Sequence, residues 1–314
     1  MQKLSKVAPK EVRYIKLGRG GAWARSSFEN GWIAFSHKEA PHELALAGDW
    51  DAVRGQLAQD GARKPHKVSD FLREVQDFYT LGPDCLWITF AEGRLWWAFA
   101  EPEIEMFHGD PEAQGARRRR VIGEWRSADI EGEPLLIHDL STKLTKTRTY
   151  RQTICRVEAA EYAVRVINAA EDPDVRAAKA ARAAFVATLL PLIRSLHERD
   201  FELLVDLTFT RLGWERVSEV GGTQQDVDIV LEQPATKARA HVQVKSAADQ
   251  AVLDDYADRL RAYDGAARFF VCHSPKGLLR PPDGDEDFHL WAGSELAAQV
   301  IEAGLVDWLL SRAA

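Results

Sequence analysis

The sequence predicts a two-domain protein of the α/β and α+β classes, with a strand-rich N-terminal domain and an α/β C-terminal domain. Three observations lead to this fold class. A length of 314 residues with 46% hydrophobic content is sufficient for two hydrophobic cores. Seven of the 10 tryptophans precede residue 130, which sets the first part apart from the rest. Near the C-terminal end, two short apolar strands carry an acid and then a Gln-x-Lys sequence.

The N-terminal domain, expected over residues 1–168, alternates short strands with two early helices. The helix at 49–59 begins with an Asp cap and places Trp50, Val53 and Leu57 on one face, and a second helix is expected at 68–78. A hairpin turn at 91–93 joins two of the strands. The strands are expected at 12–17, 31–35, 84–90 and 94–100, with further pieces near 121–126 and 153–158.

A helical connector is expected over residues 169–197. Glu171 and Asp172 precede Pro173, and proline is favoured at the first position of a helix. Residues 174–198 are rich in alanine, and Pro191 predicts a kink. One face of this helix is apolar and should pack on one of the domains; it comprises Phe185, Leu189, Leu192, Ile193 and Leu196.

The C-terminal domain, expected over residues 198–314, contains the pattern with most chemical content. Asp228 directly precedes the apolar run 229–231, and Gln243 and Lys245 close a second strand. Alternate residues of a strand share a face, so Gln243 and Lys245 point the same way. If the two strands are neighbours, Asp228 joins them. The carboxylate and the amide oxygen can then hold a hard divalent cation, Mg²⁺ or Mn²⁺, and the Lys245 ammonium lies beside a metal-bound water.

These residues resemble the PD-(D/E)xK nuclease superfamily, and within it the Mrr-like restriction endonucleases, which carry Gln-x-Lys where most relatives have Glu-x-Lys. The resemblance extends to an opening helix from Asp200 to Leu212, followed by Gly213 and Trp214. It also covers a helix at 249–264, a strand at 268–272 and a helix-rich end that includes 290–291 and 305–310. It implies a restriction-endonuclease-like α/β/α core with a mixed sheet that cleaves double-stranded DNA.

The resemblance also implies roles for individual residues. Asp228 and the side-chain carbonyl of Gln243 would bind the metal, together with the backbone carbonyl of Val244. Lys245 would orient or deprotonate the attacking water, or stabilise charge on the phosphate. Because Gln243 is neutral, we expect weaker metal binding than in a Glu-x-Lys site.

Other acids compete for a place in this site. Asp226 shares the face of Asp228 by the two-residue period, but Asp228 is preferred because it adjoins the apolar run. Glu202 on the opening helix is expected to assist as a further catalytic carboxylate, with Asp206 one turn later.

The order of elements and the aromatic content make the N-terminal domain similar to PUA-like domains, including EVE-type modules, in which a small barrel holds an unusual or flipped base. This implies base contacts by Trp23, Trp32 or Trp96, of which Trp23 follows the glycine loop at 18–21. The alternative is that these tryptophans belong to the core. Basic residues that could contact phosphates, or simply be solvated, are Arg117, Arg118, Arg119, Arg120, Lys146 and Arg148.

Composition limits the class of binding protein and the cellular compartment that are expected. A net charge of −7 argues against a nonspecific nucleic-acid binder. The three cysteines show no metal-ligand spacing, and an odd number without a disulfide framework indicates a reducing compartment. Neither a signal peptide nor a long apolar run is evident, so a cytoplasmic protein is expected.

Together these observations predict a metal-dependent DNA endonuclease that restricts DNA with modified bases, and so serves in phage defence. Cutting two strands favours a homodimer during cleavage. The alternative is a nucleic-acid-binding or nucleotide-sensing protein with a weak, RNA-directed or vestigial nuclease domain.

Overall fold

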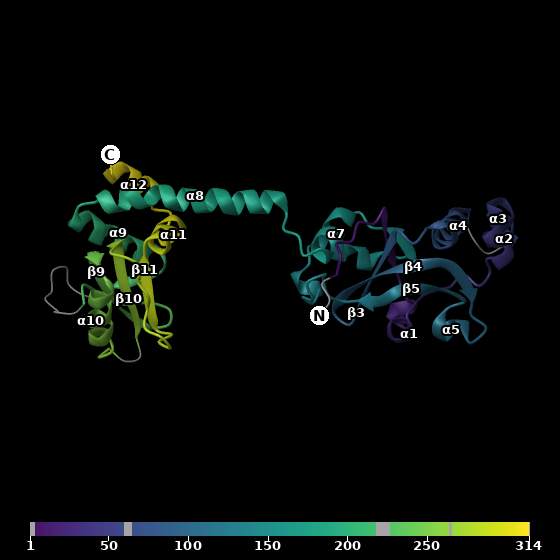
Figure 1. The fold of residues 1–314 in the computed structure, drawn as a ribbon, viewed down its shortest axis with the longest axis horizontal. Helices are drawn as coiled ribbons and strands as arrows, with labels where there is room; N and C mark the ends of the chain where they lie inside the picture. The colour runs from purple at the N-terminus through teal and green to yellow at the C-terminus, as the bar shows by residue number, and fades with distance from the viewer. Residues whose placement is uncertain (1–3, 60–64, 218–226, 264–265, 314) are drawn as a thin grey trace. The chain divides into compact units, whose positions relative to one another are not determined.

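The computed structural model describes residues 4–59, 65–217, 227–263 and 266–313. The chain divides into two compact units, Met1–Asp172 and Pro173–Ala314, here called the N-terminal and C-terminal units (Figure 1). Within the described ranges, no helix is long and apolar enough to cross a membrane.

A curled six-stranded sheet forms the centre of the N-terminal unit (Figure 1). The strand order is β2-β5-β4-β3-β1-β6, in which β1 and β3 are parallel and the other neighbours are antiparallel. The closed barrel of a PUA-like domain stays a prediction. The strands are β1 (Glu11–Ile15), β2 (Trp32–Phe35), β3 (Cys85–Ala91), β4 (Arg94–Met106), β5 (Arg117–Arg126) and β6 (Ile154–Arg156).

More helices than the two expected surround this sheet. Helices α3 and α4 confirm those two, although α4 begins earlier and ends later than the apolar pattern indicates. The helices are α1 (Ala24–Asn30), α2 (His42–Ala47), α3 (Trp50–Gln59), α4 (Pro65–Thr80), α5 (Pro111–Gln114), α6 (Thr142–Thr145) and α7 (Ala160–Ile167), with single 3-10 turns at Arg19–Gly21, Ile137–Asp139 and Lys146–Thr149.

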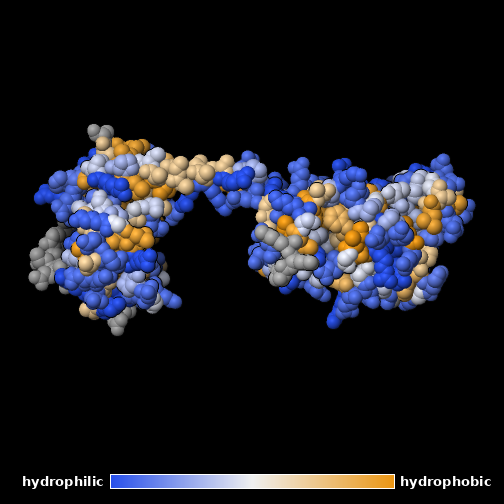
Figure 2. Space-filling view, in the orientation of Figure 1, coloured by the Kyte–Doolittle hydropathy of each residue, from blue (hydrophilic) through white to orange (hydrophobic). Residues whose placement is uncertain are grey.

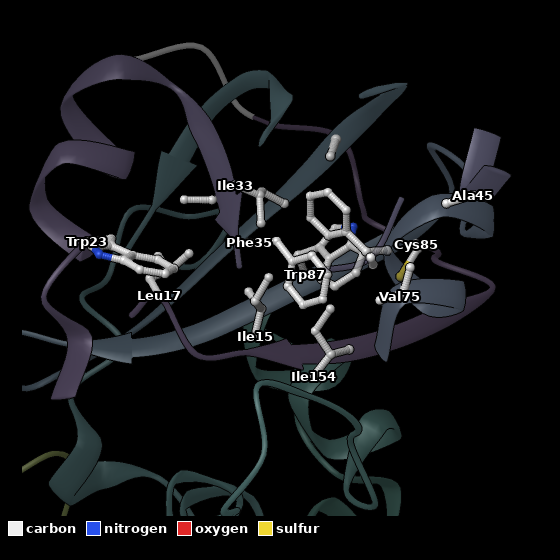
Figure 3. Packing of buried hydrophobic residues seen from close by; sticks show 14 of the residues in the cluster. Ile15, Leu17, Trp23, Ile33, Phe35, Ala45, Val75, Cys85, Trp87 and Ile154 are labelled. Atoms are coloured by element: carbon white, nitrogen blue, oxygen red, sulfur yellow. The ribbon is translucent and has the colours of Figure 1, made fainter. Parts of the chain in front are cut away.

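The main core of the N-terminal unit lies between the sheet and helices α3 and α4. Figure 3 shows Trp87 at its centre, with Phe35 and Val75 beside it. Trp87 is fully buried, and Phe78 of α4 packs edge-on against its ring with centroids 6.1 Å apart. Removing so large a buried ring typically costs about 3–5 kcal/mol.

A buried carboxylate ties three segments of this unit together. Glu74 of α4 is 1% exposed. One of its oxygens lies 2.6 Å from Nε2 of His37, just after β2. The other accepts hydrogen bonds from the backbone N–H groups of Thr153 at 2.7 Å and Ile154 at 3.2 Å. The end of β2 and the beginning of β6 are therefore held by the same side chain.

A five-stranded sheet in the order β11-β10-β9-β8-β7 forms the centre of the C-terminal unit. The pairs β9–β10 and β10–β11 are parallel, and β8 is antiparallel to both of its neighbours, so the sheet is mixed as expected. The strands are β7 (Glu215–Arg216), β8 (Ile229–Glu232), β9 (Arg239–Ala248), β10 (Ala267–Pro275) and β11 (Phe288–Ala292).

Helices cover both faces of this sheet. One face packs against α8 (Pro173–Ser195), α9 (Glu198–Arg211) and α11 (Ser294–Glu302), and the other against α10 (Gln250–Leu260). Helix α12 (Val306–Ala313) lies beside α8 (Figure 1). Leu290 and Trp291 belong to β11 and not to the helix-rich end, because Trp291 stacks on Phe209 of α9 and is buried with the sheet.

The long helix α8 begins at Pro173, as expected, and continues through Pro191. Its contacts assign it to the C-terminal unit, whereas a separate connector over 169–197 stays a prediction. Leu189, Ile193 and Leu196 pack in the core, but Phe185 is 44% exposed and does not belong to the buried face. Figure 2 shows the alanine-rich first half of this helix as a pale, weakly hydrophobic surface.

Candidate active site

The pairing of β8 with β9 determines where the Asp and Gln-x-Lys residues meet. The two strands are antiparallel neighbours, with Ile229 opposite Val242. Asp228 directly precedes β8, and its side chain contacts the Gln243 amide and the Val244 N–H of β9. Lys245 shares the face of Gln243 on β9, so the three residues gather at one end of the strand pair.

Asp228 is fixed in place from both its backbone and its side chain. Its N–H donates to the carbonyl of Val242 at 3.0 Å. Its Oδ2 accepts a 2.8 Å hydrogen bond from the backbone N–H of Val244 and a second one from the side-chain amide of Gln243. The carboxylate therefore takes the place of the next backbone acceptor in the ladder, and its position is determined by β9.

Gln243 is 2% exposed and leaves one polar atom without a partner. Its Nε2 donates to Asp228 and lies 3.5 Å from the carbonyl of Val244, whereas its Oε1 is buried without a hydrogen-bond partner. The amide nitrogen thus contacts the two other oxygens proposed as metal ligands. Reversal of the amide would present Oε1 beside the same two oxygens, a set of hard donors that suits Mg²⁺ or Mn²⁺.

Lys245 is half-buried and lies over an aromatic ring. Its Nζ is 4.7 Å from the ring centre of Tyr256 on α10, and the guanidinium of Arg259 is 5.1 Å from the same centre. Tyr256 in turn packs against Phe270 of β10. The helix that covers this face of the sheet therefore positions the lysine.

Helix α9 brings a second acidic element to the site. Burial and the negative charges of Asp228 and Glu198 raise the pKa of Glu202 above its ordinary value of 4.5. Glu202 and Asp228 are thus close enough to repel each other. Asp206, one turn along α9, lies 3.7 Å from Arg216, which also approaches the backbone carbonyl of Asp228 at 3.4 Å. Arg216 therefore joins Asp206 to the strand that begins beside Asp228.

Two further expectations about the metal site concern Val244 as a ligand and Asp226 as a competing acid. The side chain of Val244 is buried on the opposite face of β9, so only its backbone is available as a ligand. Asp226, the competing acid, lies outside the described residues. Within the described part of the chain, no three His, Cys, Asp or Glu side chains gather to hold a metal. The candidate metal site therefore depends on the amide and backbone oxygens beside Asp228.

The three tryptophans proposed as base contacts lie apart from one another. Trp23 is 7% exposed, and its Nε1 donates to the carbonyl of Glu112 at 2.9 Å. Trp96 stacks on Phe28 with centroids 3.9 Å apart. Trp32 lies 4.6 Å beneath the guanidinium of Arg118. All three pack against the main core, and of these residues Trp23 and Trp96 line separate cavities.

The arginine run 117–120 corrects another expectation, because it forms the beginning of strand β5 and two of its side chains are fully buried. Arg117 donates to the Tyr79 hydroxyl at 2.9 Å and to the carbonyls of His37 and Ala40 at 3.1 and 2.9 Å. Arg119 donates to three further carbonyls, those of Glu101, Phe78 and Ala100. Neither side chain can reach a phosphate, because both replace backbone hydrogen bonds inside the unit.

The other proposed phosphate contacts lie at the surface. Arg118 pairs with Glu105 at 2.9 Å, and Arg120 is exposed beside the carbonyl of Asn30. Lys146 pairs with Glu158 at 2.6 Å, and Arg148 is exposed. Their role in DNA binding stays a prediction.

Sequence reasoning did not find Arg216 or Tyr256. Tyr256 follows Leu253 by three positions and precedes Leu260 by four, which is the spacing of an ordinary apolar helix face. Arg216 lies on a two-residue strand that has no pattern of its own. Only the packing of α9 and α10 against the sheet reveals either residue.

Comparison with known proteins supports a nuclease identity for this part of the chain. A family model described as restriction endonuclease, Mrr_cat, matches residues 193–274. The matched region runs from the end of α8 to β10 and contains every candidate catalytic residue from Glu202 to Lys245. No curated protein and no solved structure matches the chain. The match supports nuclease activity on DNA for the C-terminal unit.

Proposed function

We propose that this chain is a metal-dependent endonuclease that cuts double-stranded DNA with modified bases, in which the N-terminal unit reads the DNA and the C-terminal unit hydrolyses the phosphodiester bond. Such an enzyme would serve as a restriction system in phage defence. The nuclease part of the proposal is supported by the restriction endonuclease match at residues 193–274.

The unpartnered oxygen of Gln243 is the observation that carries the metal dependence. A buried amide oxygen without a hydrogen bond costs about 1–3 kcal/mol, so a protein retains one where a ligand satisfies it. In the present orientation the amide nitrogen, not this oxygen, faces the oxygens of Asp228 and Val244, and reversal of the amide would complete a set of oxygen ligands. Nuclease domains of this superfamily generally use divalent metals. Asp228, Gln243 and the Val244 carbonyl would hold Mg²⁺ or Mn²⁺, which when bound neutralises charge on the scissile phosphate.

The protein's own groups then account for the remaining chemistry. Lys245 shares the face of Gln243 and would orient the attacking water or stabilise charge that develops on the phosphate. The contact of the Lys245 ammonium with the Tyr256 ring would fix its position relative to Asp228. Burial and the charge of Asp228 raise the pKa of Glu202, so its carboxylate would be a stronger base than an ordinary glutamate and would assist the proton transfer.

A nuclease with little sequence preference must be restrained, and the separate N-terminal unit supplies a place for recognition. Its glycine loop, polar cavity and surface cations are suited to a nucleic-acid ligand. Restriction of modified DNA explains why a reader and a nuclease would share one chain.

The direct test incubates the purified chain with plain plasmid and with plasmid containing methylated or hydroxymethylated cytosine, in Mg²⁺, in Mn²⁺ or in chelator. We expect metal-dependent cleavage of the modified plasmid, and none by Asp228→Asn at equal DNA binding. Sedimentation of the Asp228→Asn variant on DNA would show whether two copies assemble.

One observation favours a second function, a nucleic-acid-binding protein with a weak, RNA-directed or vestigial nuclease domain. Gln243 contributes no negative charge, and its amide nitrogen donates a hydrogen bond to the Asp228 oxygen that would bind a metal. Binding of plasmid or RNA without cleavage in either metal, and without any effect of metal on the melting temperature, would establish this alternative.

A further inference from the structure

A cavity of about 380 Å³ lies in the N-terminal unit, where β1 and β2 end and β6 begins. Ligand pockets in proteins typically occupy about 300–1,000 Å³, so this space suits a single small ring system. Its lining combines one aromatic ring, several polar side chains and three cations. The residues are Lys16, Gly18, Arg19, Gly20, Trp23, Ser36, Glu112, Arg151, Gln152 and Thr153.

The apolar wall of this cavity is rigid. Gly18 has a φ of 78°, and a Cβ at this position would lie 2.8 Å from Cδ2 of Trp23, so the backbone lies directly against the indole. The indole nitrogen is held by the carbonyl of Glu112. Figure 3 shows Trp23 at the border of the core, with its nitrogen directed away from the other side chains. Trp23 is 7% exposed, so it contributes a small, fixed apolar part of the wall and no free donor.

The amide of Gln152 is oriented before any ligand arrives. Its Oε1 accepts hydrogen bonds from Arg73 and from the Tyr150 hydroxyl, each at 2.6 Å. Both lone-pair directions are thus used, and within the described residues Nε2 has no protein acceptor. The NH₂ group is therefore an oriented donor in a cavity that Ser36 also lines, and the two residues can read the polar edge of a planar ring.

Positive charge surrounds the same cavity. Arg19 and Arg151 are exposed, and neither forms an ion pair with the described residues. Lys16 donates to the carbonyl of Tyr150 at 2.7 Å. The carboxylate of Glu112 lies 3.6 Å from Lys38, which partly offsets its charge. Two unpaired guanidiniums next to a fixed amide donor and an aromatic wall are suited to a phosphate joined to a heterocycle.

We propose that this cavity binds a nucleotide, with the polar edge of the base at Gln152 and Ser36 and its phosphate against Arg19 and Arg151. The proposal rests on the N-terminal unit acting as the reader. It assigns recognition to Ser36, Gln152, Arg19 and Arg151, and not to the arginine run on β5. The nucleotide belongs either to DNA, as a base turned out of the duplex, or to a free nucleotide, and binding alone distinguishes the two sources.

The experiment uses the full chain in chelator, so that neither metal nor cleavage contributes. One arm titrates duplex DNA that contains aminopurine, whose fluorescence rises when the base leaves the stack. The other arm titrates the four deoxynucleoside monophosphates and their methylated cytosine and adenine forms by calorimetry. Gln152→Glu keeps the acceptor for Arg73 and Tyr150 but removes the donor. Arg151→Gln removes one guanidinium, and Arg54→Gln on α3 is the matched control.

For a site that takes bases from DNA, wild-type protein and Arg54→Gln raise the aminopurine signal, and Gln152→Glu lowers affinity by about tenfold or more at an unchanged melting temperature. Arg151→Gln should also reduce the salt slope of duplex binding by about 0.9. If only monophosphates bind, and the same variants weaken them, the site takes free nucleotides. Equal binding of every probe by Gln152→Glu, Arg151→Gln and Arg54→Gln would overturn the proposal. None of these measurements depends on cleavage. A chain without nuclease activity would therefore still bind the probes, whereas a chain whose cavity takes no nucleotide would not respond to the cavity substitutions.

Discussion

The ammonium of Lys245 lies 4.7 Å from the centre of the Tyr256 ring, so a residue of helix α10 positions a candidate catalytic group of strand β9. Alternation along β9 places Lys245 beside Gln243, but its side chain has several rotatable bonds. The ring restricts these rotations, since a cation over an aromatic face is stabilised by about 0.5–2 kcal/mol.

Replacement of this ring tests the positioning. We expect Tyr256→Leu to lower the cleavage rate by roughly two- to thirtyfold, the rate equivalent of that interaction. Tyr256→Phe keeps the ring and should retain both the rate and its pH profile. Single-turnover cleavage measured against pH checks this, and an equal loss in both variants would show that the hydroxyl or the fold, and not the ring face, is what matters.

Removal of the lysine itself should have a larger effect. Lys245→Ala is expected to lower cleavage by roughly 10²–10⁴-fold, as for a lost acid–base group, while DNA binding and melting temperature change little. Quantified plasmid cleavage, with circular dichroism as the folding control, measures this. A fully active Lys245→Ala protein would remove the residue from the mechanism.

Exchange of the amide for a carboxylate tests the ligand set. Gln243→Glu places two carboxylates together, so the metal-free protein should be less stable and Mg²⁺ should raise its melting temperature more than that of the wild type. Gln243→Leu is the matched control and should show little metal effect. Calorimetric titration with Mn²⁺ gives the affinities, and weaker binding by Gln243→Glu than by the wild type contradicts the assignment.

The buried arginines of β5 should affect stability and not DNA binding. Arg119→Leu leaves the carbonyls of Phe78, Ala100 and Glu101 without their donor, and we expect a loss of about 3 kcal/mol in unfolding free energy. Arg120→Leu, on the exposed side of the same strand, should change stability by less than about 0.5 kcal/mol. Urea denaturation of both variants separates the structural role from a phosphate contact.

The C-terminal unit should lose stability in mild acid. Burial, with a smaller effect from the charge of Arg194, lowers the pKa of His273 below its ordinary value of 6.5. As pH falls below that value, the unfolded chain binds a proton that the folded His273 does not, so unfolding becomes more favourable. The contribution of neutral His273 to the free energy of unfolding is fully present above about pH 6.5 and decreases below it. Calorimetry from about pH 7 to pH 5 should show this decline, and His273→Phe should make it less steep.

Local sequence patterns predicted the strands of the candidate nuclease better than the environment of its site. The apolar run after Asp228 and the Gln-x-Lys sequence located both strands, because alternation is a local property. The end of the second strand was predicted wrongly, since β9 continues past Lys245 to Ala248 in its pairing with β10. The contacts of Tyr256 and Arg216 depend on how α9 and α10 lie against the sheet, which no local pattern contains. Leu290 and Trp291 show the same limit, since a short apolar pair fits a helix or a strand equally well.

The arginine run shows why composition misled in the N-terminal unit. Four consecutive arginines indicate a charged surface, yet in a strand every second side chain points into the protein. There, Arg117 and Arg119 supply donors to the carbonyls that the helices and bends leave open. The cations beside the cavity, Arg19 and Arg151, are isolated in sequence and become neighbours only because β1 ends where β6 begins.

The shared anchor at Glu74 limits how this protein could acquire a new ligand preference. His37 adjoins Ser36, and Thr153 adjoins Gln152, so one buried carboxylate holds two of the segments that line the cavity. Mutations beneath these segments would disturb the fold together with the binding surface, whereas Arg19 and Arg151 are free of that constraint. Diversification, in nature or in a selection experiment, should therefore concentrate at the solvent-facing rim, and the floor of the cavity should tolerate few replacements.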